Sequence, residues 1–183
     1  MYINVEDIIL DDNSLLREKS ARVALPLSVQ DKEILLKMVE YVSDSTDDEL
    51  AQERHLKPAV GLAAPQIGIL KQMLAVVIHE EDKVIKYALV NPKVLSHSVM
   101  NSYLENGEGC LSVINSHPGF VKRHYKIKIK AYDLLQDKEV IINAKDFLSI
   151  VLQHEMDHLN GVLFYDHIDK ENPLKPIENS VVI

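Results

Sequence analysis

The sequence predicts an α+β fold in which mainly antiparallel sheets surround one central buried helix. Residues 147–161 carry two adjoining apolar stripes at helical spacing, which is typical of a helix that is mostly buried. The 183 residues are 46% hydrophobic and 26% charged, which suits a single domain, residues 1–183, with a sizeable core. Several strand-like segments are separated only by short turns; they are residues 72–78, 84–90, 93–104, 120–132 and 138–144.

The N-terminal part of the chain predicts helices in which no chemistry is visible. Residues 13–22 read as a capped helical stretch. Residues 28–43 predict an amphipathic helix, because apolar side chains recur on one side. In residues 46–55, Thr46 precedes Glu49 by three positions, which is the spacing of a capping box and indicates one more short helix. We expect these segments to supply packing.

Residues 57–68, KPAVGLAAPQIG, combine small side chains that let another backbone approach closely. A peptide substrate that adds to the edge of a sheet requires such an approach, and Val60 and Gly61 are the candidate contacts. The side-chain amide of Gln66 could donate to an oxygen that becomes negative when a carbonyl is attacked. The alternative is a loop between a helix and a strand, capped by Gln66, and this stretch alone favours the alternative.

A turn at residues 106–107 precedes the only cysteine, Cys110. Gly109 permits a tight backbone there, so the backbone amide of Leu111 could join Gln66 in an oxyanion hole. A buried, inert cysteine is the competing interpretation of Cys110. This segment alone favours that interpretation.

The segments at 120–132 and 138–144 predict a hairpin. Basic residues alternate with others between positions 122 and 130, which indicates the solvated face of a strand rather than a strip that binds nucleic acid. Residues 162–168 read as a returning strand. The tail that ends at 181–183 is too short and too interrupted by prolines for a terminal helix.

The helix at 147–161 carries the clearest chemical pattern, His154-Glu155-x-x-His158. Residues four apart lie one above the other on a helix face, so both imidazoles can reach one cation. Glu155 points to an adjoining sector, where a base can accept a proton from water without occupying a ligand position. The alternative is a pair of core histidines beside a surface glutamate. Asp146 is the predicted N-cap, and the glycine at the end of this range supplies a left-handed stop.

A tetrahedral ion needs a third protein ligand besides two histidines. Phe164 stands where one known continuation of this motif has a histidine. Glu178 follows at a suitable distance, but Pro173 and Pro176 deny that segment the regular helix needed to aim it. Cys110 is the remaining candidate, because a Cys-His-His site with an open fourth position is a recognised catalytic arrangement.

Two other interpretations stay open at this point. A metallopeptidase would use the same helix with Glu178 as its third ligand. A structural metal protein would need four protein ligands, so His124 or His167 would complete the set and the metal-free protein should unfold.

Three motifs occur in the order found in peptide deformylases, and the chain resembles that family, in the subtype common in Gram-positive bacteria, over nearly its whole length. The motifs are VGLAAPQ at 60–66, EGCLS at 108–112 and HEMDHLNG at 154–161. The resemblance implies a metal-dependent hydrolase that removes the N-formyl group from the N-terminal formylmethionine of nascent polypeptides and releases formate. It also implies Fe²⁺ in the cell, with Zn²⁺, Ni²⁺ or Co²⁺ able to substitute, whereas ligand chemistry alone suggests zinc.

The resemblance assigns roles to the residues already singled out. Glu155 would take a proton from a water activated by the ion, and Gln66 and the Leu111 amide would face the formyl oxygen. Three residues share the helix stripe of the ligands and could wall a slot for the methionine side chain, although ordinary core is an equal alternative. They are Phe147, Ile150 and Val151.

Some positions bear on this resemblance individually. Asp157 could orient the site through Arg123, which occupies the place of a family arginine; a plain surface aspartate is the alternative. Ala59 stands where the family usually has glycine, and His117 where it more often has an apolar residue. The family's other subtype has a terminal helix linked with ribosome docking, so we expect no direct ribosome contact here.

Composition narrows the remaining classes of function. The formal net charge of -8 argues against tight general binding to nucleic acid. The N-terminal segment is acidic and lacks a signal-peptide core, and no apolar run approaches the ~20 residues that span a bilayer. A single cysteine fits a reducing compartment. We therefore expect a cytoplasmic monomer whose partners are formylmethionyl peptides emerging from the ribosome, with no membrane and no specific nucleic acid.

Overall fold

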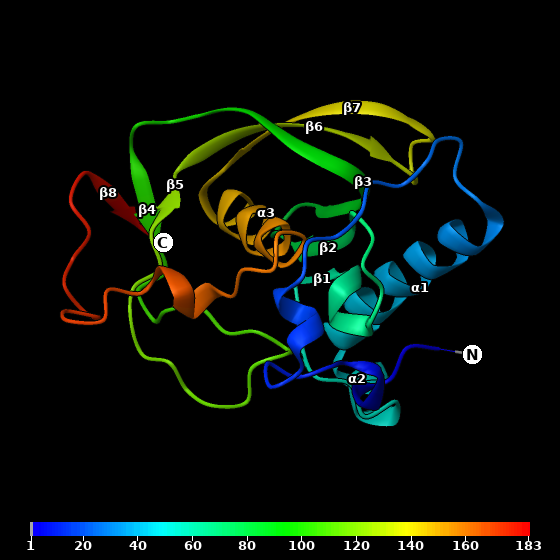
Figure 1. Cartoon of the computed structure of the whole chain (residues 1–183), viewed down its shortest axis with the longest axis horizontal. Coiled ribbons are helices and arrows are strands. Elements are labelled where there is room, and N and C mark those ends of the chain that lie inside the picture. The colour runs from blue at the N-terminus through cyan, green and yellow to red at the C-terminus, as the bar shows by residue number, and fades with distance from the viewer. Residues whose placement is uncertain (1) are drawn as a thin grey trace.

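The computed structural model describes residues 2–183 and contains two β-sheets (Figure 1). The larger sheet has the strand order β1-β2-β3-β6-β7, and each neighbouring pair is antiparallel. The smaller sheet has the order β5-β4-β8, with β4 and β8 parallel. The prediction of an α+β fold with mainly antiparallel sheets is therefore confirmed. The strands are β1 Gly61–Ala63, β2 Met73–His79, β3 Val84–His97, β4 Asn101–Tyr103, β5 Arg123–His124, β6 Lys126–Asp133, β7 Lys138–Lys145 and β8 Ser180–Val182.

Helices cover both faces of the larger sheet. Helix α1 (Val29–Ser45) packs against one face and α3 (Asp146–His158) against the other (Figure 1). Successive residues of β2 point to opposite faces, so Val77 lies in the cluster with α1 and Val76 in the cluster with α3. The predicted amphipathic helix is confirmed, with the Ser28 side chain accepting a hydrogen bond from the first turn of α1.

β3 spans the predicted strand 84–90 and the first part of the predicted strand 93–104, whose last part forms β4, so the predicted division into two strands is wrong. The register between β3 and β6 shifts around Asn91, which adopts φ +52°. The Asn91 side chain forms 2.8 Å hydrogen bonds with both the backbone N–H and the C=O of Val23. These bonds hold the bulge in place, and strand pairing resumes beyond it.

Two predicted N-terminal helices are shorter than expected. The stretch 13–22 contains a 3-10 helix at Ser14–Arg17. Helix α2 (Asp48–Glu53) begins after Asp47, whose side chain accepts hydrogen bonds from two backbone N–H groups of the first turn. Thr46 is therefore not the N-cap, because its hydroxyl donates instead to the last turn of α1.

α3 begins one residue earlier than predicted. Asp146 is its first residue, with φ +53°, and Lys145 holds the N-cap position without a side-chain hydrogen bond, so the predicted Asp146 cap is wrong. The predicted left-handed stop is present, because Gly161 adopts φ +73°. A Cβ at Gly161 would lie 2.3 Å from the carbonyl oxygen of Arg17, so this approach requires glycine.

The C-terminal part differs from the prediction in one element. Residues 162–168 do not form a strand, because Phe164–His167 is a 3-10 helix. The Asp166 carboxylate accepts the Leu163 N–H at 2.9 Å and pairs with Arg17. The local pattern of apolar residues does not indicate this pairing with Arg17.

The predicted strand 120–132 is divided between β5 in the smaller sheet and β6 in the larger sheet, and only the β6 part of the basic segment forms the predicted solvated face, because Arg123 of β5 is buried. Lys126, Lys128 and Lys130 are exposed, whereas the residues between them are buried. Within residues 2–183, no helix is both long and apolar enough to span a bilayer.

Candidate metal centre

Cys110 lies beside two histidines of α3, far along the chain from it. The rings of His154 and His158 lie one helical turn apart, with their centroids separated by 5.0 Å. Cys110 follows β4, and its Sγ lies 3.3 Å from Nε2 of His158. One ligand atom from each of the three lies within 4.8 Å of the others. In the described part of the chain, this group does not include the rival ligands Glu178, His124 and His167.

Glu108 connects this group to a buried arginine. Its carboxylate is bonded to Nδ1 of His154 at 2.8 Å and accepts hydrogen bonds from Nε and Nη2 of Arg123 at 2.8 and 2.9 Å. Burial raises the pKa of Glu108, but the hydrogen bonds with Arg123 and His154 outweigh it and lower the pKa to about 2. A carboxylate on Nδ1 orients the ring and leaves Nε2 for a metal. Sequence reasoning assigned Glu108 no role, although its place two residues before a candidate ligand is a usable signal.

Arg123 also reaches α3, so the predicted contact with Asp157 is confirmed. Nη1 of Arg123 donates to the Asp157 carboxylate, which is also bonded to Nε2 of His167 at 2.7 Å. The Arg123 and Glu108 side chains are each only 3% exposed. Arg123 therefore ties the segment that carries the cysteine to the helix that carries both histidines.

The two histidines differ in protonation when no ion is bound. Burial lowers the pKa of His158 well below its usual value, so its ring is neutral, which is the form that binds a metal. Burial also lowers the pKa of His154, but interactions with Cys110 and Glu108 raise it to about 10. A sulfur and two imidazole nitrogens this close together fit a divalent transition metal and leave one position open, provided that His154 gives up its proton.

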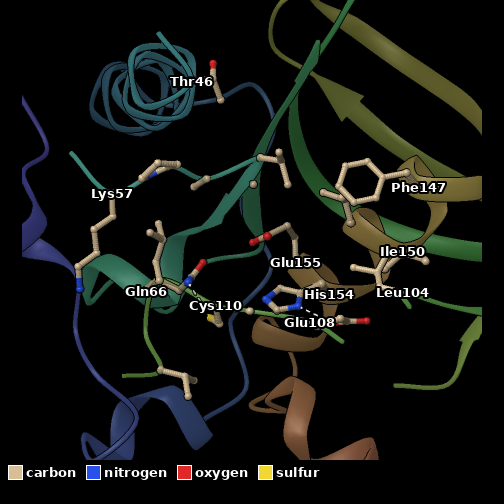
Figure 2. Close-up of a pocket in the computed structure, with 18 of the residues that line it drawn as sticks. Thr46, Lys57, Gln66, Leu104, Glu108, Cys110, Phe147, Ile150, His154 and Glu155 are labelled. Atoms are coloured by element: carbon tan, nitrogen blue, oxygen red, sulfur yellow. Dashed lines mark hydrogen bonds and ion pairs between the residues drawn. The ribbon is translucent and has the colours of Figure 1, made fainter. Parts of the chain in front are cut away.

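Glu155 lies next to this group, between α3 and β1 (Figure 2). Its Oε2 atom is buried and has no hydrogen-bond partner within residues 2–183. Burial raises the pKa of Glu155 to about 7, which suits a group that takes and returns a proton near neutral pH. A Cβ at Gly61 would lie 2.4 Å from Oε1 of Glu155, so the glycine of β1 makes room for the carboxylate.

Gln66 points its amide at the cysteine. Its Oε1 accepts the backbone N–H of Ala63 at 2.9 Å, which fixes which end of the amide faces the site. Its Nε2 then lies 3.5 Å from Sγ of Cys110 and 3.2 Å from Oγ of Ser112. Gln66 does cap a short helix, as the alternative interpretation expected, but its Nε2 atom also presents a hydrogen-bond donor to the site.

A cavity of about 670 Å³ opens beside these groups, within the range of ~300–1,000 Å³ typical of ligand sites. Figure 2 shows Phe147 and Ile150 on one side of it, Lys57 on the other, and Glu155 between them. Sequence reasoning missed Leu104, which also lines the cavity. The lining includes every predicted substrate contact together with the oxyanion candidates; these are Val60, Gly61, Gln66, Gly109, Leu111, Phe147, Ile150 and Val151.

Comparison with known proteins gives the family. Residues 5–173 match the family model described as polypeptide deformylase. The chain is 50% identical to Peptide deformylase 2 of Bacillus subtilis (strain 168) over 184 aligned residues, which span 99% of this chain and 98% of that protein. The chain belongs to the polypeptide deformylase family. Deformylases of this family are metal-dependent hydrolases that remove the N-formyl group from nascent polypeptides, and the chain is an enzyme of this class.

Other relatives support the same assignment. A peptide deformylase of Staphylococcus epidermidis (strain ATCC 12228 / FDA PCI 1200) is 47% identical over 99% of this chain and 100% of its own length. The crystal structure of a probable peptide deformylase from synechococcus phage S-SSM7 has a TM-score of 0.69 and 30% identity, and the match covers 88% of this chain and 98% of that one. The deformylase from Ehrlichia chaffeensis has a TM-score of 0.71 at 26% identity, with 94% of this chain and 91% of that chain covered. The resemblance to the Gram-positive subtype is confirmed by the Bacillus and Staphylococcus relatives.

Proposed function

We propose that residues 1–183 act as one catalytic domain, organised around α3, that hydrolyses the formamide bond of N-formylmethionyl peptides. The observation that carries this proposal is the convergence of Cys110, His154 and His158, with ligand atoms within 4.8 Å of one another, beside the buried carboxylate of Glu155. A carboxylate next to a three-ligand site with an open position is the arrangement that hydrolysis by an activated water requires.

Cys110, His154 and His158 would hold one divalent ion, which in such a site lowers the pKa of water and polarises a carbonyl. Fe²⁺ is the proposed ion in the cell, with Zn²⁺, Ni²⁺ or Co²⁺ as substitutes, because thiolate and imidazole ligands accept all four. Glu108 supports the set by holding the ring of His154 in the orientation that leaves Nε2 free.

Glu155 would move the proton. With a pKa of about 7, its carboxylate can accept a proton from the attacking water and return it to the leaving amine. The water oxygen bonds to the formyl carbon, the C–N bond breaks, and the products are formate and a free amino terminus.

Gln66 and Leu111 would stabilise the formyl oxygen as its charge develops. The Nε2 atom of Gln66 is aimed towards Cys110, where the reacting carbonyl would lie. The backbone N–H of Leu111 directly follows the cysteine in the chain. Two donors fixed before the reaction begins need no reorganisation in the transition state.

The methionine side chain of the substrate would lie against the apolar wall of the cavity. An unbranched thioether adapts well to such a wall. Val60, Gly61 and Gly109 would contact the peptide backbone along the edge of β1, as an added strand would. We propose that the enzyme acts as a monomer on peptides that emerge from the ribosome. The wall is formed by Phe147, Ile150 and Val151.

Release of formate from formyl-Met-Ala by the metal-loaded enzyme tests this function. Glu155→Gln keeps the shape of the side chain but not its basicity, so kcat should fall by roughly 10²–10⁴ while the metal content is unchanged. Glu178→Ala, outside the proposed ligand set, is the matched control and should behave as the unmodified enzyme. Undiminished formate release by Glu155→Gln would contradict the assigned base.

Elemental analysis after anaerobic purification tests the identity of the ion. The expected result is about one iron per chain, with activity lost in air and restored by Ni²⁺ or Co²⁺. Zinc in anaerobically prepared, fully active enzyme would contradict the proposed iron.

A further inference from the structure

His167 lies at the outer end of a chain of hydrogen bonds that leads to a proposed metal ligand. Its Nε2 is bonded to Oδ2 of Asp157 at 2.7 Å, and Nη1 of Arg123 donates to the same oxygen. From Arg123 the chain continues through Glu108 to Nδ1 of His154, and Figure 2 shows this last contact as a dashed line. His167 is therefore no rival ligand, but it is connected to the ring of one.

Solvent exposure falls along this chain of contacts. The side chain of His167 is 35% exposed and that of Asp157 is 23% exposed, whereas those of Arg123 and Glu108 are each 3% exposed. A guanidinium this deeply buried depends on protein groups for its hydrogen bonds, because leaving it unpaired is costly. Asp157, by contrast, has water within reach and can turn its carboxylate outwards unless a second group holds it.

His167 supplies that second group. A carboxylate beside a guanidinium is ionised and only accepts hydrogen bonds, so Nε2 of His167 donates to it. The imidazole and the guanidinium thus share one oxygen of Asp157. Rotation of the carboxylate away from Arg123 would break both hydrogen bonds at once.

The 3-10 helix Phe164–His167, which carries this histidine, is anchored by contacts that do not involve α3. Asp166 pairs with Arg17, and the hydroxyl of Tyr165 donates to Asp11 at 3.2 Å. Both partners belong to the N-terminal part of the chain. The imidazole therefore holds Asp157 against a separately fixed part of the protein.

A role in folding alone does not account for this contact. Ion pairs and hydrogen bonds between partly exposed groups contribute little to stability. The groups behind the ligands of a metal, in contrast, strongly affect how tightly the metal is bound, because they orient the ligands. The contact between His167 and Asp157 lies at the accessible end of such a set of groups.

We propose that His167 is a positioning residue for the metal centre. By holding Asp157 on Arg123, it would keep the guanidinium in the orientation that places two donors on Glu108. Glu108 in turn would keep the ring of His154 aimed at the ion. This inference rests on the ligand set of the proposed function and extends its support to a residue at the protein surface.

Co²⁺ binding, measured by competition with a chelator, tests the proposal. His167→Ala should weaken the affinity for Co²⁺ about tenfold, the lower end of the range for groups that support ligands. The visible absorption of bound Co²⁺, which depends on ligand geometry, should shift. His167→Gln should retain most of the affinity, because its amide nitrogen can donate to the same carboxylate. The KM of the fully loaded enzyme and the denaturation midpoint of the metal-free protein should be nearly unchanged in both variants.

A second background tests whether His167 acts through Asp157. In Asp157→Asn, adding His167→Ala should cause almost no further loss of affinity, since the carboxylate that the imidazole holds is already gone. The control is His79→Ala, which removes an exposed histidine of β2 that is bonded to Thr46 outside this chain of contacts. It should bind Co²⁺ as the unmodified protein does.

Unchanged affinity and an unchanged spectrum in His167→Ala would overturn the positioning role. A tenfold loss that persists in the Asp157→Asn background would overturn it as well. The proposed function fails separately, if the unmodified, metal-loaded enzyme releases no formate from formyl-Met-Ala; the Co²⁺ affinities would still measure the effect of His167 on the ion.

Discussion

A single methyl group at position 61 should disable the proposed base. An alanine Cβ there would lie 2.4 Å from Oε1 and 2.7 Å from Cδ of Glu155, whereas ordinary contact begins at 3.4 Å. The carboxylate must therefore move by about 1 Å, the difference between 3.4 and 2.4 Å. A displacement of this size in a catalytic group can lower a rate by about 10²-fold. We expect Gly61→Ala to lower kcat for formate release by about that factor while the metal content remains unchanged.

A double-mutant cycle separates this effect from a general disturbance of β1. Overpacking alone should destabilise Gly61→Ala by about 1–3 kcal/mol in chemical denaturation. In a Glu155→Ala background the clashing atoms are absent, so adding the methyl group should cost almost nothing further. The difference between the two backgrounds measures the contact between residues 61 and 155.

Two results would refute this reasoning. Near-normal kcat in Gly61→Ala would show that the carboxylate tolerates the shift or is not the base. An equal loss of stability in both backgrounds would show that the glycine is required for the strand itself.

Three further predictions concern the ligands and their support. Glu108→Gln should weaken metal affinity about 10–100-fold in a chelator competition, and unchanged affinity would exclude support through His154. The pKa of Glu108 falls from 4.5 to about 2 on folding, so this carboxylate contributes about 3 kcal/mol to the free energy of unfolding above pH 4.5, and the contribution is lost as the pH falls towards 2. Chemical denaturation of the metal-free protein should therefore show lower stability at pH 3 than at pH 5. The difference should be smaller in Glu108→Gln. Cys110→Ser should abolish metal binding by elemental analysis while Glu178→Ala retains it, and the reverse would favour the metallopeptidase interpretation.

Local patterns in the sequence were sufficient for much of the fold. The helix at 28–43 and the helix that carries His154 follow from apolar spacing alone, because each buries one stripe against the sheet. The error at 162–168 has a physical cause. A short turn there is held by the pairing of Asp166 with Arg17, and a contact across 149 positions has no local signature.

Some features of the candidate site likewise follow from local sequence patterns, whereas others depend on contacts between distant segments. Spacing alone brings His154 and His158 to one face of a helix, whereas Cys110 was suggested as their partner by the elimination of other candidate ligands and by the motif order of a known family. The contact between Gly61 and Glu155 and the bidentate pairing of Arg123 with Glu108 depend on how β1, α3 and the loop before the cysteine are stacked. No periodic pattern in the sequence predicts how these three segments pack together.

These contacts tie the proposed ligands to the rest of the protein through side-chain hydrogen bonds. Cys110 is held between Gln66, in the 3-10 helix that follows β1, and His158 on α3. Arg123 joins Glu108 to Asp157 and so connects the cysteine segment to α3 a second time. A structural metal site, by contrast, supplies folding energy that the apo chain lacks. We therefore expect the metal-free protein to stay folded, in contrast to a protein with a structural metal site.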